Sequence, residues 1–251
     1  MMRNYSLWLL LPLLYSVCTA AGLWMVYFVG IRDERIKPLF SQNRSRRYAP
    51  YISILGNFPP ASCIFSEVMN MAAFVGFIIG VLRYHQLRPV INKAWLNILC
   101  LVLFSLSCFG MTLVGNIQIF TQMVVHSVGA FGTFVLGTIY CWIQSGITIQ
   151  VDLRNEGKKV GIVRFLLSGG ITICLIAYGI LMSQRNHMNA ARVQWAMVML
   201  FLTFLATFGV EFRHSRFDFV HTQTFGIPVR EAETDGSTIR ERGAAKVSNM
   251  L

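Results

Sequence analysis

The segment at residues 7–31, LWLLLPLLYSVCTAAGLWMVYFVGI, carries no charged side chain along its whole length. A helix needs about 20 apolar residues to cross the roughly 30 Å hydrocarbon core of a bilayer, and this segment is long enough. Five further segments are uncharged or nearly so and have similar lengths: residues 64–82, 94–114, 128–149, 165–182 and 193–210. Together these segments predict six membrane-spanning helices.

The composition indicates that lipid surrounds most of the chain. Mean hydropathy is +0.55 and only 13% of the residues are charged. Since backbone groups inside hydrocarbon must bond within the protein, such segments form helices rather than open strands. We therefore expect an all-α, polytopic membrane protein in which residues 1–217 form one six-helix transmembrane domain. Residues 218–251 lack apolar periodicity and are predicted to be a disordered tail in the cytosol.

The formal charge of +11 does not indicate nucleic acid, because the basic residues lie in short clusters beside the ends of the spans. If six spans cross the bilayer, 14 of the 22 Lys and Arg residues lie on the side that holds both termini, and eight lie on the other. Cytosolic segments carry the excess of basic residues. The count therefore predicts that the N- and C-termini are both cytosolic.

One sequence motif agrees with this orientation. Asn43-Arg44-Ser45 is an acceptor sequence for N-glycosylation, and it lies in the first exterior loop, away from both flanking spans. Asn43 is therefore the predicted glycosylation site.

Small residues in the second span follow the spacing of close helix packing. Ala72, Gly76 and Gly80 are four residues apart and share one helix face. Small residues at this spacing let a neighbouring backbone approach closely in lipid. The pattern does not tell whether the partner helix belongs to the same chain.

The cytosolic links carry basic residues that can serve two purposes. The candidates for binding lipid headgroups are Arg154, Lys158, Lys159 and Arg164. Each basic residue near an anionic leaflet contributes about 1 kcal/mol of attraction. The alternative is that they only fix the topology of the chain.

The sequence contains no catalytic or metal-binding motif that we recognise, so we expect neither an enzyme nor a cofactor. Polar side chains within or near the spans are the remaining candidates for function: Asn70, Asn97, Asn116, Gln118, Gln144 and Gln194, with Glu67 and Glu211 near helix ends. If the chain forms a pore, Asn70, Asn116 and Gln144 are the leading candidates to line it. Such groups either bond between helices or line a pore.

Ordered blocks of sequence between residues 7 and 217 resemble one known family. They are PYIS at residues 50–53, PP at 59–60, SCIFS at 62–66, RYHQL at 83–87, GNIQ at 115–118 and HSVG at 126–129. The chain resembles the family of damage-regulated autophagy modulators and transmembrane protein 150. CWIQ at 141–144, NEGKKVG at 155–161 and VEFRH at 210–214 are most similar to its tentonin-like branch, transmembrane protein 150C. Ile117 departs from the phenylalanine expected in the GNIQ block.

This resemblance implies six spans with cytosolic termini. For the tentonin-like branch it implies a mechanosensitive, nonselective cation channel with calcium permeability, or an accessory subunit of one. The membrane would be the plasma membrane or an endosomal or lysosomal membrane. The expected partners are bilayer lipids, anionic lipids among them, cations if the chain forms a pore, and further copies or other channel subunits. The alternative is a non-conducting scaffold that regulates phosphoinositide kinase recruitment or autophagy.

Overall fold

The computed structural model describes residues 6–41, 47–153, 157–213 and 215. Within these ranges the chain is helical and contains no strand, apart from one isolated bridge between Ile36 and Tyr48. The predicted glycosylation site Asn43, the basic residue Arg154 and the predicted tail lie outside the described residues.

Among the described residues, six helical segments are long and apolar enough to cross a membrane, and five of them are longer than the stretches that predicted them. They are Leu7–Gly30, Ala61–Leu87, Ala94–Asn116, Met123–Val151, Gly157–Ser183 and His187–Phe212. The protein is therefore an all-α, multi-pass membrane protein with a six-helix bundle.

The helices begin and end at the following residues. They are η1 Leu7–Leu9, α1 Leu10–Gly30, α2 Ile52–Leu55, α3 Ala61–Leu87, α4 Ala94–Asn116, α5 Met123–Phe131, the π-helical turn η2 Gly132–Leu136, α6 Gly137–Val151, α7 Gly157–Ser183, α8 His187–Ala206 and α9 Phe208–Phe212.

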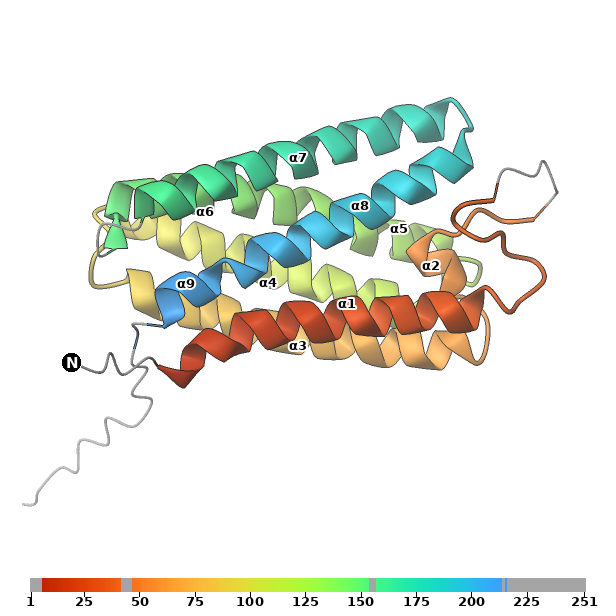
Figure 1. Cartoon of the computed structure of the whole chain (residues 1–251), viewed down its shortest axis with the longest axis horizontal. Coiled ribbons are helices and arrows are strands. Elements are labelled where there is room, and N and C mark those ends of the chain that lie inside the picture. Colours follow the sequence, from red (N-terminus) through yellow and green to blue (C-terminus); the bar gives the residue numbers. More distant parts are fainter. Residues whose placement is uncertain (1–5, 42–46, 154–156, 214, 216–251) are drawn as a thin grey trace, which may run out of the picture. The chain divides into compact units, whose positions relative to one another are not determined.

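The six spans run lengthwise along the same direction (Figure 1), and their packing contacts close into a ring. Each span packs against the next one along the chain, and α8 returns to contact α1. We call the end of the bundle where α1 begins and α9 lies the terminal end. The opposite end, where α1 finishes and α2 lies, is the loop end.

The outer surface of the bundle is apolar, as a protein surrounded by lipid requires. Phe74 is 62% exposed, Leu166 is 73% exposed and Ile173 is 69% exposed. Large contiguous apolar surfaces are rare on soluble monomers but match the interior of a bilayer. These side chains are therefore placed to face lipid.

At the loop end, the segment after α1 folds back into the bundle. The indole nitrogen of Trp195 donates to the carbonyl of Pro50 at 3.0 Å, and the backbone N–H of Ile52 donates to Oε1 of Gln194 at 3.1 Å. The rings of Trp24 and Trp195 lie 4.8 Å apart. Buried polar groups need such partners, so α2 is fixed between α1 and α8.

The fourth span is interrupted by the π-helical turn η2, where it approaches α4 closely. A Cβ on Gly110 would lie 2.5 Å from the carbonyl oxygen of Gly129, so only glycine fits there. The hydroxyl of Ser107 on α4 donates to the carbonyl of Thr133 at 3.0 Å. Single π turns occur often at functional sites, and this one lies beside the central cavity described below.

Candidate functional site: a buried charge cluster and a central cavity

Three ionised side chains from three helices meet inside the terminal end of the bundle. Arg83 on α3 is 1% exposed, Arg164 on α7 is 0% exposed and Glu211 on α9 is 6% exposed. Ionised groups inside a membrane protein are costly unless they pair within the protein. We call these three residues, together with Gln144 and Thr148 on α6, the buried charge cluster.

Glu211 is the carboxylate that both arginines share. Its Oε2 accepts a hydrogen bond from Nη2 of Arg164 at 2.5 Å. Its Oε1 lies 3.0 Å from Nη2 of Arg83, as an ion pair without the alignment of a hydrogen bond. Two guanidinium groups and one carboxylate leave the cluster with one net positive charge.

The other nitrogens of Arg83 bind neutral acceptors. Nε donates to Oε1 of Gln144 at 3.1 Å, and Nη1 donates to Oε1 of Gln86 at 2.6 Å. Nη2 also donates to the hydroxyl oxygen of Thr148 at 3.3 Å. Every guanidinium nitrogen of Arg83 therefore has a partner, which lowers the cost of burying its charge.

The guanidinium of Arg164 is satisfied in the same way. Its Nε donates to the hydroxyl of Thr207 at 2.8 Å, and its Nη1 donates to the hydroxyl of Thr148. The ring of Phe208 lies beneath both arginines, with its centroid 4.3 Å from Cζ of Arg164 and 5.2 Å from Cζ of Arg83. Cation–π contacts of this kind are worth about 2 kcal/mol when desolvated.

The break between α8 and α9 brings Glu211 to this position. Thr207 separates the two helices, and its hydroxyl donates to the carbonyl of Phe204 at 2.6 Å. Phe208 and Phe212 are fully buried and place α9 against the bundle. The side-chain nitrogen of Gln86 donates to the backbone carbonyl of Glu211 at 3.1 Å. The cluster therefore joins the terminal ends of α3, α6, α7 and α9.

The three leading polar candidates from the sequence lie in two different places. Gln144 is 1% exposed and belongs to the buried charge cluster. Asn70 and Asn116 exchange two hydrogen bonds between α3 and α4, at 3.0 and 2.9 Å. The hydroxyl of Ser66 adds a third bond to Asn116 at 2.7 Å. This amide pair lies towards the loop end, because α4 ends at Asn116.

The small-residue face of α3 packs inside the same chain. Ala72, Gly76 and Gly80 are all buried. A Cβ on Gly76 would lie 3.3 Å from the hydroxyl of Tyr15 on α1, and one on Gly80 would lie 2.7 Å from Cδ1 of Phe104 on α4. The missing side chains let α1 and α4 approach α3 closely.

Two of the basic candidates are exposed and one is not. Lys158 and Lys159 lie in the first turn of α7 with exposed side chains. The prediction that Arg164 faces lipid headgroups is wrong, because its side chain is fully buried and pairs with Glu211. Five residues beyond Lys159, Arg164 points into the bundle, where a carboxylate satisfies its charge.

Sequence reasoning did not identify Arg83 as a site residue, and it named Glu211 only as a polar group near a helix end. Arg83 follows an apolar run and was counted as a topology signal, and Glu211 follows the run at residues 193–210. One signal was available: Glu211 lies between Phe208 and Phe212, so a helix that continued past residue 210 would carry a carboxylate into an apolar environment.

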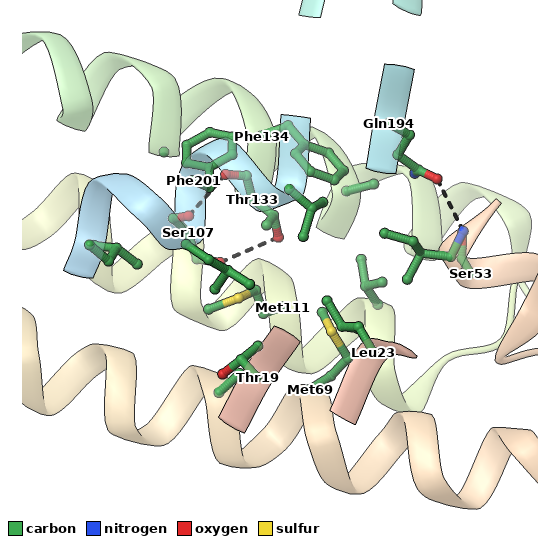
Figure 2. Close-up of a pocket in the computed structure, with 18 of the residues that line it drawn as sticks. Thr19, Leu23, Ser53, Met69, Ser107, Met111, Thr133, Phe134, Gln194 and Phe201 are labelled. Atoms are coloured by element: carbon green, nitrogen blue, oxygen red, sulfur yellow. Dashed lines mark hydrogen bonds between the residues drawn. The ribbon is translucent and has the colours of Figure 1, made fainter. Parts of the chain in front are cut away.

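A cavity of about 110 Å³ lies at the centre of the bundle. Figure 2 shows Thr19 and Leu23 of α1, Met69 of α3, Met111 of α4 and Phe201 of α8 around it. Most of the lining side chains are apolar. A mainly apolar lining suits an apolar occupant.

Tyr140 on α6 lies between the cavity and the buried charge cluster. Its side chain lines the cavity and stacks on Phe104 with ring centroids 4.4 Å apart. Its ring also lies edge-on to Phe208 of the cluster, at 6.3 Å. Its hydroxyl is buried and has no hydrogen-bond partner among the described residues.

These features define a six-span helical membrane protein that is held together at one end by buried ion pairs and encloses an apolar cavity. Residues 7–215 match the family model described as the Frag1/DRAM/Sfk1/Cwh43P N-terminal domain. The chain belongs to this family.

Similar proteins carry names from the transmembrane protein 150 group. The Xenopus laevis protein called modulator of macroautophagy TMEM150B-B is 31% identical over 86% of this chain and 90% of its own length. Human modulator of macroautophagy TMEM150B is 33% identical over 81% of this chain and 84% of its own length. Human transmembrane protein 150A is 28% identical over 92% and 93% respectively. No solved structure matches the chain.

Proposed function

We propose that this chain is a non-catalytic, non-conducting membrane protein that modulates macroautophagy. The observation that carries the proposal is the match to proteins named as modulators of macroautophagy, which extends over four-fifths or more of the chain. The match includes the spans that build the buried charge cluster and the central cavity.

The contacts inside the bundle support a non-conducting role. A cation path needs oxygen ligands or charged groups that face water. Here the side-chain oxygen of Gln144 accepts a hydrogen bond from Arg83, while the side-chain amides of Asn70 and Asn116 hydrogen-bond to each other. The central cavity is lined mainly by apolar side chains. Mechanosensitive cation conduction with calcium permeability stays a prediction of the tentonin-like resemblance.

The terminal end of the bundle supports a contact with anionic lipids. Lys158 and Lys159 are exposed where α7 begins, and two such residues near an anionic leaflet contribute about 2 kcal/mol of attraction. We propose that the terminal end faces the cytosol and that the protein acts on endosomal or lysosomal membranes, with the plasma membrane as a further location. There it acts as a scaffold for proteins that supply phosphoinositides.

The experiment is a measurement of autophagic flux in cells that lack the chain and in cells that express it again. Flux is the accumulation of lipidated autophagosome marker when lysosomal degradation is blocked. We expect loss of the chain to change flux and re-expression to restore it. Flux that is unchanged in both fed and starved cells contradicts the proposal.

The lipid contact is tested in the same cells with Lys158→Gln/Lys159→Gln. The matched control is Arg32→Gln, an exposed basic residue at the loop end. We expect the double variant to restore flux less well than the control. Equal restoration would remove the two lysines from the proposed mechanism.

A further inference from the structure

The central cavity is long and narrow and runs parallel to the helices. On α4 its lining residues extend from Phe104 to Val114, and on α8 from Gln194 to Leu205. At 1.5 Å of rise per residue, these stretches are about 15 Å long. The volume of about 110 Å³ is the space open to the centre of a water-sized sphere of about 1.4 Å radius. When this volume is spread over that length and the radius of the sphere is added on each side, the bore is about 6 Å.

Polar side chains along the middle of the cavity donate their hydroxyl protons to backbone carbonyls rather than to an occupant of the cavity. The hydroxyl of Ser107 donates to the carbonyl of Thr133, and the hydroxyl of Thr133 donates to the carbonyl of Gly129 at 2.9 Å. Figure 2 shows this pair on one side of the cavity, next to Phe134 and Phe201. Because these hydroxyl protons are already donated, the middle of the cavity offers few hydrogen bonds to a water molecule.

The loop end of the cavity differs, because it keeps polar groups with unused bonding capacity. Gln194 uses its side-chain oxygen to accept the N–H of Ile52. Its amide nitrogen and the hydroxyl of Ser53 form no hydrogen bond with a described residue, and both side chains line the cavity. Ser53 is half-buried, so at this end the lining includes a residue that is partly exposed at the surface of the bundle. The cavity is therefore most polar at the loop end and mainly apolar along the rest, with the hydroxyl of Tyr140, unpartnered among the described residues, near the buried charge cluster.

We infer that the cavity binds one acyl chain of a membrane lipid, with the polar end of the lipid at Ser53 and Gln194. The bore fits a single methylene chain and is too narrow for the fused rings of a sterol. The length accommodates a chain rather than a compact molecule. The surrounding bilayer supplies such chains at high concentration. This inference does not depend on the proposed role in autophagy.

The test is photolabelling in phosphatidylcholine liposomes that contain a phosphatidylcholine with a diazirine in its acyl chain. Crosslinks are mapped by mass spectrometry at the cavity residues Met111 and Phe201, and at the outward-facing residues Phe109 and Ile173, which report on ordinary bilayer contact. We expect the wild-type protein to be labelled at both groups of residues.

Two variants fill the cavity: Val198→Phe on α8 and Ala130→Leu on α5. The matched control is Val128→Phe, at a position on α5 that is 61% exposed. We expect each filling variant to reduce the ratio of cavity to surface labelling about tenfold, which corresponds to about 1.4 kcal/mol of binding. The control keeps the wild-type ratio. Size-exclusion profiles and thermal unfolding establish that each variant is folded.

Three results overturn the inference. The first is wild-type protein labelled only at outward-facing residues. The second is cavity labelling that persists in the folded filling variants. The third is a diazirine sterol that labels the cavity residues in place of the acyl probe, which would assign the cavity to another class of lipid.

Discussion

Replacing Glu211 with glutamine keeps the size of the side chain and removes its charge, so it tests the buried charge cluster directly. In the wild-type protein this carboxylate pairs with Arg83 at 3.0 Å and with Arg164 at 2.5 Å. After the substitution, two buried guanidinium groups have neutral acceptors only. Removing one partner of a buried ion pair costs about 3–5 kcal/mol, because the other charge stays buried and unpaired.

We therefore expect Glu211→Gln to lower the free energy of unfolding by at least about 3 kcal/mol. For a bundle of this size, that change lowers the midpoint of thermal unfolding by about 10 °C. The assay is thermal unfolding of purified protein in detergent, followed by the loss of the monodisperse peak on size exclusion. Glu67→Gln is the matched control, since Glu67 is exposed on α3.

A compensating variant separates loss of charge balance from loss of packing. Arg83→Met/Arg164→Met/Glu211→Leu replaces all three ionised groups with apolar side chains. Replacing a whole buried ion network is often neutral or stabilising, so this variant should be more stable than Glu211→Gln. The reasoning is refuted if Glu211→Gln unfolds within about 1 kcal/mol of the wild type, or if Glu67→Gln costs as much.

Three further predictions concern packing, the amide pair and topology. Gly80→Ala should destabilise the bundle by about 1–3 kcal/mol because its Cβ would overlap Phe104. The control Gly169→Ala on α7, which has open space around it, should be neutral or stabilising. Equal unfolding midpoints for the two variants would contradict this prediction. Asn116→Ala removes a half-exposed interhelix contact and should cost only about 0.6–2 kcal/mol; a loss above about 3 kcal/mol in the same assay would assign the pair a larger role. Asn43→Gln should increase electrophoretic mobility as much as glycosidase treatment of the wild type does, and identical mobility would remove the support for an exterior first loop.

The number and type of the spans could be predicted from the sequence because both depend on local properties. An uncharged stretch of about 20 residues in lipid has no alternative to a helix. The small-residue face at Ala72, Gly76 and Gly80 was likewise visible as a four-residue spacing. The partner helices of that face, α1 and α4, depend on tertiary packing that spacing alone does not reveal.

The buried charge cluster could not be predicted because its members are distant in the chain. Arg83 and Glu211 are separated by most of the spans, and each lies at the edge of an apolar run, where charge usually marks the membrane surface. Arg164 belongs to a basic link and was assigned to lipid for that reason. Only the closed ring of spans and the break at Thr207 bring the three together.

The π-helical turn was also hidden from the sequence. Residues 128–149 read as one uninterrupted apolar helix, whereas the fourth span begins at Met123 and changes its winding at Gly132–Leu136. Beside this turn, α4 approaches Gly129 too closely for any Cβ at Gly110. Hydropathy records how apolar a segment is and carries no information about such an approach.

The proposed non-conducting role requires that paired polar groups and an apolar interior seal this bundle against ions. The most direct measurement is patch recording from liposomes that contain the purified protein at known density, under graded suction. We predict currents equal to those of protein-free liposomes at every tension. A stretch-activated cation current that rises with protein density and changes in Gln144→Ala would contradict the claim and restore the channel interpretation.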